Sequence, residues 1–110
     1  MRESIVKEYR RGRLGRLEVC DAQPELLRVA RNLGRQTDTE CPICEQERLV
    51  HVTFAFGPGL PPSGLPLADL RELSKAARRS SEVACYVVEV CTGCCWNHLL
   101  SVFTAGGNDR

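Results

Sequence analysis

The chain has 110 residues, of which 43% are hydrophobic and 26% are charged, and its formal net charge is +1. This composition matches one ordinary globular domain with a modest core and excludes a disordered chain, which would carry fewer apolar residues. No apolar run approaches the roughly 20 residues of a membrane-spanning helix and the first residues lack the apolar core of an export signal, so we expect a cytoplasmic protein.

The charges are unevenly distributed along the chain. Residues 1–35 contain nine Lys or Arg and five Asp or Glu, a net charge of +4 (9 − 5). Residues 36–110 contain six and nine, a net charge of −3 (6 − 9). We therefore expect a basic N-terminal arm and a more acidic remainder.

The arm, residues 1–36, is predicted to hold two short helices, because apolar residues recur there at three- and four-residue steps. Those of the first helix are Ile5, Val6 and Tyr9, and those of the second are Leu26, Val29, Ala30 and Leu33. Two glycines weaken any continuation of the first helix. Asp21 is expected to cap the start of the second helix, and Gly34 is expected to end it in a left-handed conformation.

A strand, a loop and a helix are predicted next. After a polar linker at residues 36–40, Val50, Val52, Phe54 and Phe56 alternate onto one face of a half-buried strand. Residues 57–66 hold four prolines and three glycines, which excludes a regular helix or strand. Residues 67–79 have the spacing of an amphipathic helix.

The last part of the chain is predicted to form a hairpin. Residues 83–90 are rich in strand-favouring side chains, and residues 96–103 form a second such run. The hairpin folds over residues 91–95, and the tail at 105–110 is expected to be flexible.

Two Cys-x-x-Cys pairs are the most informative motif. Cys41 and Cys44 precede the first predicted strand, and Cys91 and Cys94 lie inside the hairpin. Two intervening residues let the backbone turn so that both sulfurs face one point about 2.3 Å away, and two such turns complete a closed tetrahedral site. In a chain without an export signal this pattern favours metal over a disulfide framework. The sequence therefore predicts one structural zinc ion.

Other residues near these pairs leave alternatives open. A shift of one residue would make Cys95 the fourth ligand in place of Cys94, and a spare Cys95 thiol beside the metal would be oxidisable, so a thiol redox sensor is one alternative function. His98 is close enough to replace a ligand or to donate a hydrogen bond to a sulfur. Cys20 and Cys85 are interpreted as small buried hydrophobic residues.

The cysteine motifs lack a catalytic signature. Nucleobase deaminases carry His-x-Glu before Pro-Cys-x-x-Cys, whereas the residues two beyond His51 and His98 are Thr53 and Leu100. A zinc ion with four thiolates has no open position for a substrate. We expect a non-enzymatic adaptor or regulator that binds another protein.

A basic run gives a second alternative function. Arg10, Arg11, Arg13 and Arg16 lie close together in the N-terminal arm. Clustered cations bind nucleic acid by releasing its counterions. A nucleic-acid-binding factor in transcription or translation is therefore the alternative.

Four short segments carry a resemblance to a known family. They are Val-Cys-Asp-Ala at 19–22, Leu-Leu-Arg-Val-Ala-Arg at 26–31, Cys-Pro-Ile-Cys at 41–44 and Val-Glu-Val-Cys-Thr-Gly-Cys-Cys-Trp-Asn-His-Leu at 88–99. Over nearly its whole length the chain resembles small uncharacterised actinobacterial proteins that share a domain of unknown function. The resemblance implies a bacterial cytoplasmic setting and the Cys-x-x-Cys pairs as metal ligands, without an activity. The position of Cys95 is atypical for the motif.

These observations predict an α+β protein. Residues 37–104 are expected to form a zinc ribbon, a three-stranded antiparallel sheet with a loop and helix inserted at 57–80. The helical arm of residues 1–36 docks on this ribbon.

Overall fold

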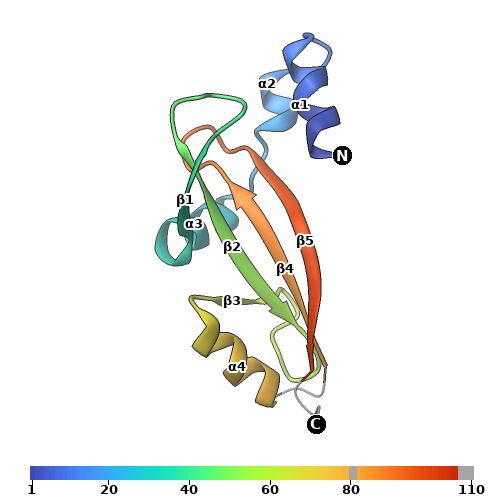
Figure 1. Ribbon diagram of the computed structural model, residues 1–110, viewed down its shortest axis with the longest axis vertical. Helices are drawn as coiled ribbons and strands as arrows, with labels where there is room; N and C mark the ends of the chain where they lie inside the picture. The colour runs from blue at the N-terminus through green and yellow to red at the C-terminus, as the bar shows by residue number, and fades with distance from the viewer. Residues whose placement is uncertain (80–81, 107–110) are drawn as a thin grey trace.

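The computed structural model, which describes residues 1–79 and 82–106, contains helices at both ends of a twisted antiparallel sheet (Figure 1). The helices are α1 (Arg2–Arg10), α2 (Arg16–Val19), α3 (Pro24–Leu33) and α4 (Leu70–Arg79). The strands are β1 (Arg35–Glu40), β2 (Arg48–Phe56), β3 (Leu65–Leu67), β4 (Glu82–Val90) and β5 (Asn97–Gly106). The predicted α+β class and the helical N-terminus are confirmed.

The sheet has five strands rather than the predicted three. Its order is β1-β2-β4-β5, and β3 pairs with the same edge of β2 as β1, further along the strand. The polar residues predicted as a linker form β1, which is ordered by backbone pairing with β2 and by a hydrogen bond of 2.8 Å from Thr37 Oγ1 to the Leu49 carbonyl. Within the Pro/Gly segment, Leu65–Leu67 forms β3, and this short edge strand tolerates Pro66 because an edge residue can leave its nitrogen unpaired.

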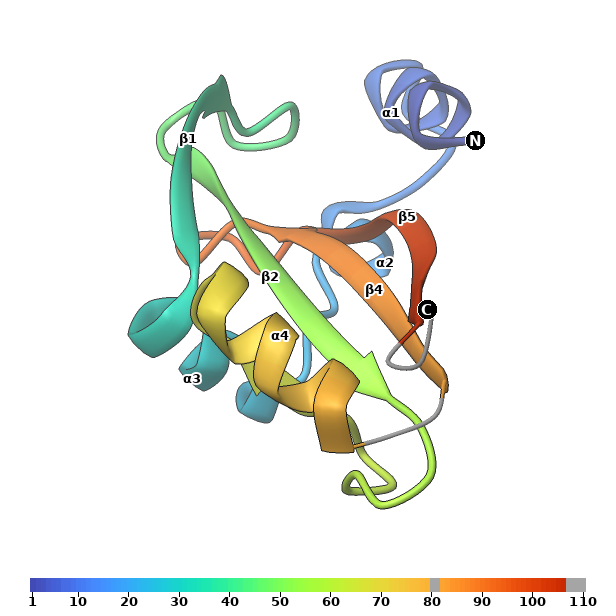
Figure 2. The same ribbon diagram turned by 60° about the horizontal axis from the view of Figure 1, so that its bottom comes forward.

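Each face of the central strands is covered by a different helix. On one face Ala30 of α3 packs with Val52 of β2 and Val90 of β4. On the other face Ala76 of α4 joins a cluster with Ala55 of β2 and Cys85 of β4. Figure 2 shows α4 in front of β2, and Figure 1 shows it at the end of the sheet far from the cysteine pairs. The prediction that β2 is buried on one face only was wrong. On the face opposite Val52, Ala55 is buried in the cluster with α4 and Leu49 is buried in a cluster with Val6 and Val19.

Two predicted helix ends differ from the structure. Gln23, not Asp21, is the residue before α3, and Pro24 occupies its first position. Gly34 ends α3 at φ −72° and ψ 150°, an extended rather than a left-handed conformation. Glycine is nevertheless required here, because a Cβ would lie 2.0 Å from Val50 Cγ1 and 2.4 Å from the Ala30 carbonyl oxygen.

Helix α4 begins three residues later than predicted. Leu67 belongs to β3, and the Oδ1 atom of Asp69 accepts a hydrogen bond of 3.0 Å from the backbone N–H of Glu72. This contact satisfies one of the unpaired donors of the first turn and fixes the start of the helix.

The N-terminal helices dock at the end of the sheet that carries the cysteine pairs. Val6 of α1 and Val19 of α2 lie in one buried cluster with Leu49 and Trp96. The short helix α2 was not predicted. The division of the chain at residue 36 stays a prediction, although β1 already begins at Arg35.

The molecule is elongated, with extents of 49 × 25 × 24 Å. The cysteine pairs lie at one end and α4 at the other (Figure 1). Strand β5 continues to Gly106, so residues 105–106 of the predicted flexible tail are paired, and residues 107–110 lie outside the described part of the chain. Within the described part, no helix has the length and apolar character needed to cross a bilayer.

Candidate metal centre

The structure brings the two predicted cysteine pairs together. The Sγ atoms of Cys41, Cys44, Cys91 and Cys94 all lie within 4.8 Å of one another. The separation is 3.7 Å between Cys41 and Cys94 and 3.7 Å between Cys44 and Cys91. A tetrahedral ion with metal–sulfur bonds of about 2.3 Å places its ligands about 3.8 Å apart. The four sulfur atoms are therefore spaced as the ligands of a four-sulfur metal site are.

The two pairs occupy equivalent backbone turns, which we call the knuckles (residues 41–45 and 91–95). In each knuckle the fifth residue donates its backbone N–H to the first carbonyl, from Glu45 to Cys41 and from Cys95 to Cys91, both at 3.0 Å. In each the fifth residue is left-handed, with φ 55° at Glu45 and 77° at Cys95. Non-glycine residues adopt this conformation only at a cost, so both turns are held by their surroundings.

Backbone N–H groups of the knuckles already point at the sulfurs. The N–H of Ile43 donates to Cys41 Sγ and that of Cys94 donates to Cys91 Sγ, both at 3.4 Å. Such hydrogen bonds stabilise a thiolate and orient it towards a metal. The knuckle backbone is thus arranged to stabilise cysteine thiolates.

The surroundings of the thiols act on their pKa values in opposite directions. Burial raises the pKa of Cys41 to about 11 and also raises the pKa of Cys94. Burial acts upward on Cys44 as well, but hydrogen bonds from the backbone of Gln46 and Glu47 lower its pKa to about 7. Four adjacent thiolates repel one another, and a divalent cation supplies the charge that lets them ionise together.

The alternative ligands Cys95 and His98 lie outside the group of four in the part of the chain that the structure describes. The Cys95 backbone closes the second knuckle, and its carbonyl accepts a hydrogen bond of 3.0 Å from the N–H of Ala22. The ring of His98 stacks on Trp96, with centroids 6.0 Å apart and planes 8° from parallel. His98 is therefore engaged with an aromatic neighbour.

Cys20 is the residue that sequence reasoning missed. It was interpreted as a buried hydrophobic residue, yet it is only partly buried and its Sγ lies 3.4 Å from Cys94 Sγ. The two are 74 positions apart, so no local spacing could have signalled the contact. Cys85, in contrast, is fully buried in the cluster beneath α4, as predicted.

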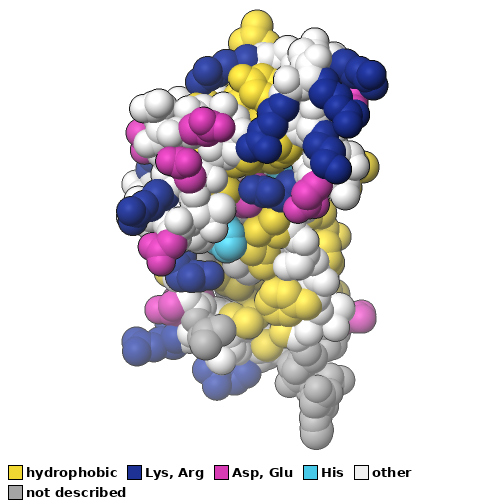
Figure 3. All heavy atoms as spheres, turned by 45° about the horizontal axis from the view of Figure 1, so that its top comes forward, with side chains coloured by type: hydrophobic (Ala, Val, Ile, Leu, Met, Phe, Trp, Pro, Cys, Tyr) yellow, Lys and Arg dark blue, Asp and Glu magenta, His cyan; other side chains and the backbone are white. Residues whose placement is uncertain are grey.

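The four arginines of the basic run are all exposed at the N-terminal helices, where Lys and Arg side chains gather on the surface (Figure 3). Arg11 and Arg13 lie 3.5 and 3.4 Å from the carboxylate of Glu8. One carboxylate therefore offsets part of the charge of the run.

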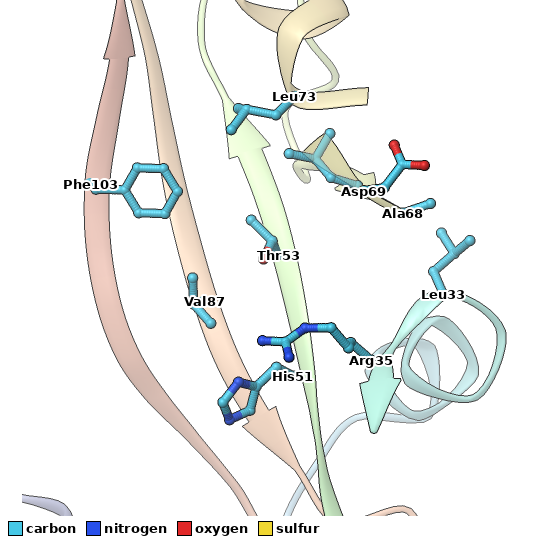
Figure 4. A pocket seen from close by; sticks show the side chains of 10 residues that line it. Leu33, Arg35, His51, Thr53, Ala68, Asp69, Leu73, Val87 and Phe103 are labelled. Carbon is cyan, nitrogen blue, oxygen red and sulfur yellow. The ribbon is translucent and has the colours of Figure 1, made fainter. Parts of the chain in front are cut away.

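A hollow of about 460 Å³ lies on the face of the sheet beside α4 (Figure 4). Its lining residues are Leu33, Arg35, His51, Thr53, Leu67, Ala68, Asp69, Leu73, Val87 and Phe103. The sequence did not predict it, because these residues come from several separate elements. Arg35 and His51 face each other across the β1–β2 pair, and the guanidinium group points towards the imidazole ring.

The fold and the four clustered cysteines define a small α+β protein. It has N-terminal helices, a five-stranded antiparallel sheet and a candidate four-cysteine metal centre. The chain belongs to a family of unknown function, DUF5318, whose model matches residues 1–110. It is 43% identical over 105 residues to an uncharacterised protein of Mycobacterium bovis and to its counterparts in two strains of Mycobacterium tuberculosis. The matches cover 96% of this chain and 77% of each relative. No solved structure matches the chain.

Proposed function

We propose that Cys41, Cys44, Cys91 and Cys94 bind one zinc ion in a closed structural site, which makes the knuckle end of the sheet a zinc ribbon. The observation that carries this proposal is the pair of 3.7 Å sulfur separations, which match the edge of a zinc–thiolate tetrahedron. With four protein ligands, such an ion has no open position for a substrate. The metal would therefore serve structure, and the protein would act without catalysis.

Native mass spectrometry combined with zinc analysis tests the site. We expect one zinc ion per wild-type chain and loss of bound zinc in Cys44→Ser, which removes a partly buried ligand with little change in volume. Cys95→Ser and His98→Ala are the controls, and both should retain the ion. Full zinc in Cys44→Ser, or its loss in His98→Ala, would assign the ligands differently.

We infer that the protein is an adaptor whose partner docks at the hollow beside α4. The walls of the hollow are mainly apolar, and Phe103 of β5 is 42% exposed at its rim. Leu33, at the end of α3, also lines the hollow and is 37% exposed. Exposed apolar side chains that line a hollow mark a site where a partner can dock.

The charges in the hollow indicate the chemistry of the partner. Among residues 1–79 and 82–106, neither Arg35 nor His51 forms an ion pair with a carboxylate. Asp69 also lines the hollow, but one of its oxygens already caps α4. A guanidinium group prefers a carboxylate, which it can bind through two hydrogen bonds. The best fit is a protein segment with an apolar side chain next to Asp or Glu.

Crosslinking in the native cell, with the captured proteins identified by mass spectrometry, tests the adaptor function. A specific partner should be lost from both Phe103→Asp and Arg35→Glu, because the first removes an apolar contact and the second repels an acidic residue. Leu17→Asp is the matched control, since Leu17 is 88% exposed on α2, far along the chain from the hollow. If wild type and all three variants captured the partner equally, docking at the hollow would be contradicted.

The exposed cluster of arginines supports nucleic-acid binding as the second candidate function. Contacts from Arg10, Arg11, Arg13 and Arg16 to four phosphates would give a slope of about −3 to −4 for log affinity against log salt concentration. The double substitution Arg10→Glu with Arg16→Glu should abolish such binding, whereas Arg71→Glu in α4 should not. The absence of binding to RNA or DNA at low salt would rule this function out.

A further inference from the structure

A close contact between thiols in the candidate metal centre involves a residue outside the ligand set. Cys20 Sγ lies 3.4 Å from Cys94 Sγ, closer than the 3.7 Å that separates Cys41 from Cys94 and Cys44 from Cys91. Since four cysteines already complete a tetrahedron, Cys20 would remain a free thiol in contact with a ligand.

The segment that carries Cys20 is fastened to the second knuckle. The Ala22 N–H donates to the Cys95 carbonyl at 3.0 Å, and the Asn97 side-chain amide donates to Asp21 Oδ1 at 3.0 Å. On the other side, the Cys20 N–H closes α2 through a bond of 2.8 Å to the Arg16 carbonyl. Cys20 is therefore held against Cys94 from both directions.

Both thiols in contact are partly exposed, as are Cys44 and Cys95. Cys20 and Cys94 are partly buried, whereas Cys41 is 1% and Cys91 0% exposed. A disulfide bond measures about 2.05 Å, so the two sulfurs need to approach by about 1.4 Å. A small oxidant dissolved in water would reach this pair before the buried ligands.

We propose that Cys20 and Cys94 form a disulfide in the presence of hydrogen peroxide and thereby release the zinc ion, an inference that rests on the zinc site proposed above. The Cys94 sulfur attacks one peroxide oxygen, the O–O bond breaks, and hydroxide leaves and is protonated to water. The Cys20 sulfur then attacks the sulfenic acid at Cys94, the S–S bond forms, and the second oxygen leaves as water with the Cys20 proton. In total, two thiols are oxidised and one peroxide is reduced to two waters.

The consequence for the metal follows from its coordination. A disulfide sulfur carries no negative charge, so the ion would lose one of four thiolate ligands. Cys95 is a poorer partner than Cys20, because its backbone is fixed in the left-handed turn that closes the knuckle. The structure thus points to Cys20, rather than Cys95, as the residue that would couple oxidation to the metal.

The test uses the full-length, zinc-loaded protein, treated with hydrogen peroxide in the presence of a chromogenic zinc chelator. Wild type should release one zinc ion per chain, and peptide mapping without reductant should find Cys20 linked to Cys94. Cys20→Ser should release zinc at least about tenfold more slowly, because no thiol then contacts the oxidised Cys94. Cys95→Ser should behave as wild type.

Release from Cys20→Ser at the wild-type rate would overturn the proposal, as would a disulfide formed through Cys95. Disulfide mapping of the wild-type chain tests the pairing of Cys20 with Cys94 independently of whether Cys20→Ser folds. The zinc content before oxidation separates the two proposals: a chain without zinc contradicts the metal site, while mapping of its disulfide still tests the pairing of Cys20 with Cys94.

Discussion

The side chain of Glu89 links the metal-centre end of the sheet to the N-terminal helix. It is 3% exposed and accepts a hydrogen bond of 2.9 Å from Trp96 Nε1 and one of 2.5 Å from Arg2 Nε. A buried carboxylate is costly unless it is paired in this way. Trp96 follows directly after the second knuckle, so the network couples α1 to the cysteines.

Replacement of Trp96 by Phe should destabilise the protein by about 1–3 kcal/mol, because the buried Glu89 carboxylate loses a donor. Equilibrium unfolding in urea measures the effect. Arg2→Ala is the comparison and should cost less, since the Arg2 side chain is 24% exposed and water can take its place. Equal stability of Trp96→Phe and wild type would show that the hydrogen bond contributes nothing.

Gly34→Ala should lower the free energy of unfolding by about 1–3 kcal/mol, because the new methyl group would overlap Val50 and the Ala30 carbonyl. The matched control is Gly15→Ala, whose Cβ would lie 3.5 Å from a carboxylate oxygen of Glu18, an ordinary contact. Thermal unfolding of both variants checks this. A similar midpoint for the two would mean that Val50 of β2 and the Ala30 carbonyl make room for the methyl group without cost.

Single residues differ in how far their roles could be predicted from the sequence. The four cysteines were predicted to converge because the internal spacing of each pair restricts its backbone turn. Asp21 and Gly34 have typical capping residue types, but the hydrogen bond to Asn97 and the contact with Val50 depend on parts of the chain that are distant in sequence. Cys20 shows the same limit, since its partner is brought to it only by the fold.

At the scale of the elements, the two edges of the sheet differ in charge. Strand β1 reads Arg-Gln-Thr-Asp-Thr-Glu and carries three charged residues, whereas β5 carries none. Charged side chains on an edge strand prevent pairing with other chains. The neutral edge of β5 is therefore the more open to a partner, next to the hollow.

The start of α4 gives a prediction at this scale. Asp69→Ala should reduce stability by about 0.5–2 kcal/mol, since it removes the hydrogen bond to the Glu72 N–H. Asp69→Asn should restore most of the loss, because asparagine caps helices about as well. Urea unfolding of the three proteins measures the difference, and a loss in Asp69→Asn as large as in Asp69→Ala would exclude capping as the cause.

The longer elements with an apolar pattern were predicted, whereas the polar strand β1 was not. Strands β2, β4 and β5 are rich in apolar or β-branched residues and were predicted, as was the hairpin of β4 with β5. The residues of β1 carry no such pattern, because they form a strand through backbone pairing with β2. The apolar spacing placed the start of α4 one turn too early. Leu67 fits the helical spacing, but it belongs to β3, where its side chain is buried.

At the scale of the whole molecule, two cores lie at opposite ends of the sheet. The core at the knuckle end contains Cys41 and Cys91 together with Val6, Val19 and Trp96. The core beneath α4 contains none of the four candidate ligands. Removal of the metal should therefore affect the two ends unequally.

Zinc binding to a structural site contributes about 10–16 kcal/mol, as much as the whole stability of a typical domain. After chelation, hydrogen exchange should accelerate first in the knuckles and in α1 and α2, and later in β3 and α4. Hydrogen exchange measured by mass spectrometry resolves these segments. Uniform protection with and without chelator would contradict a structural role for the ion.

The central claim is that one ion holds the two knuckles together through four sulfurs. X-ray absorption at the zinc edge of the purified protein tests it most directly. We expect a first shell of four sulfur atoms at about 2.3 Å and no lighter ligand. A shell with nitrogen or oxygen, or with fewer than four sulfurs, would contradict it.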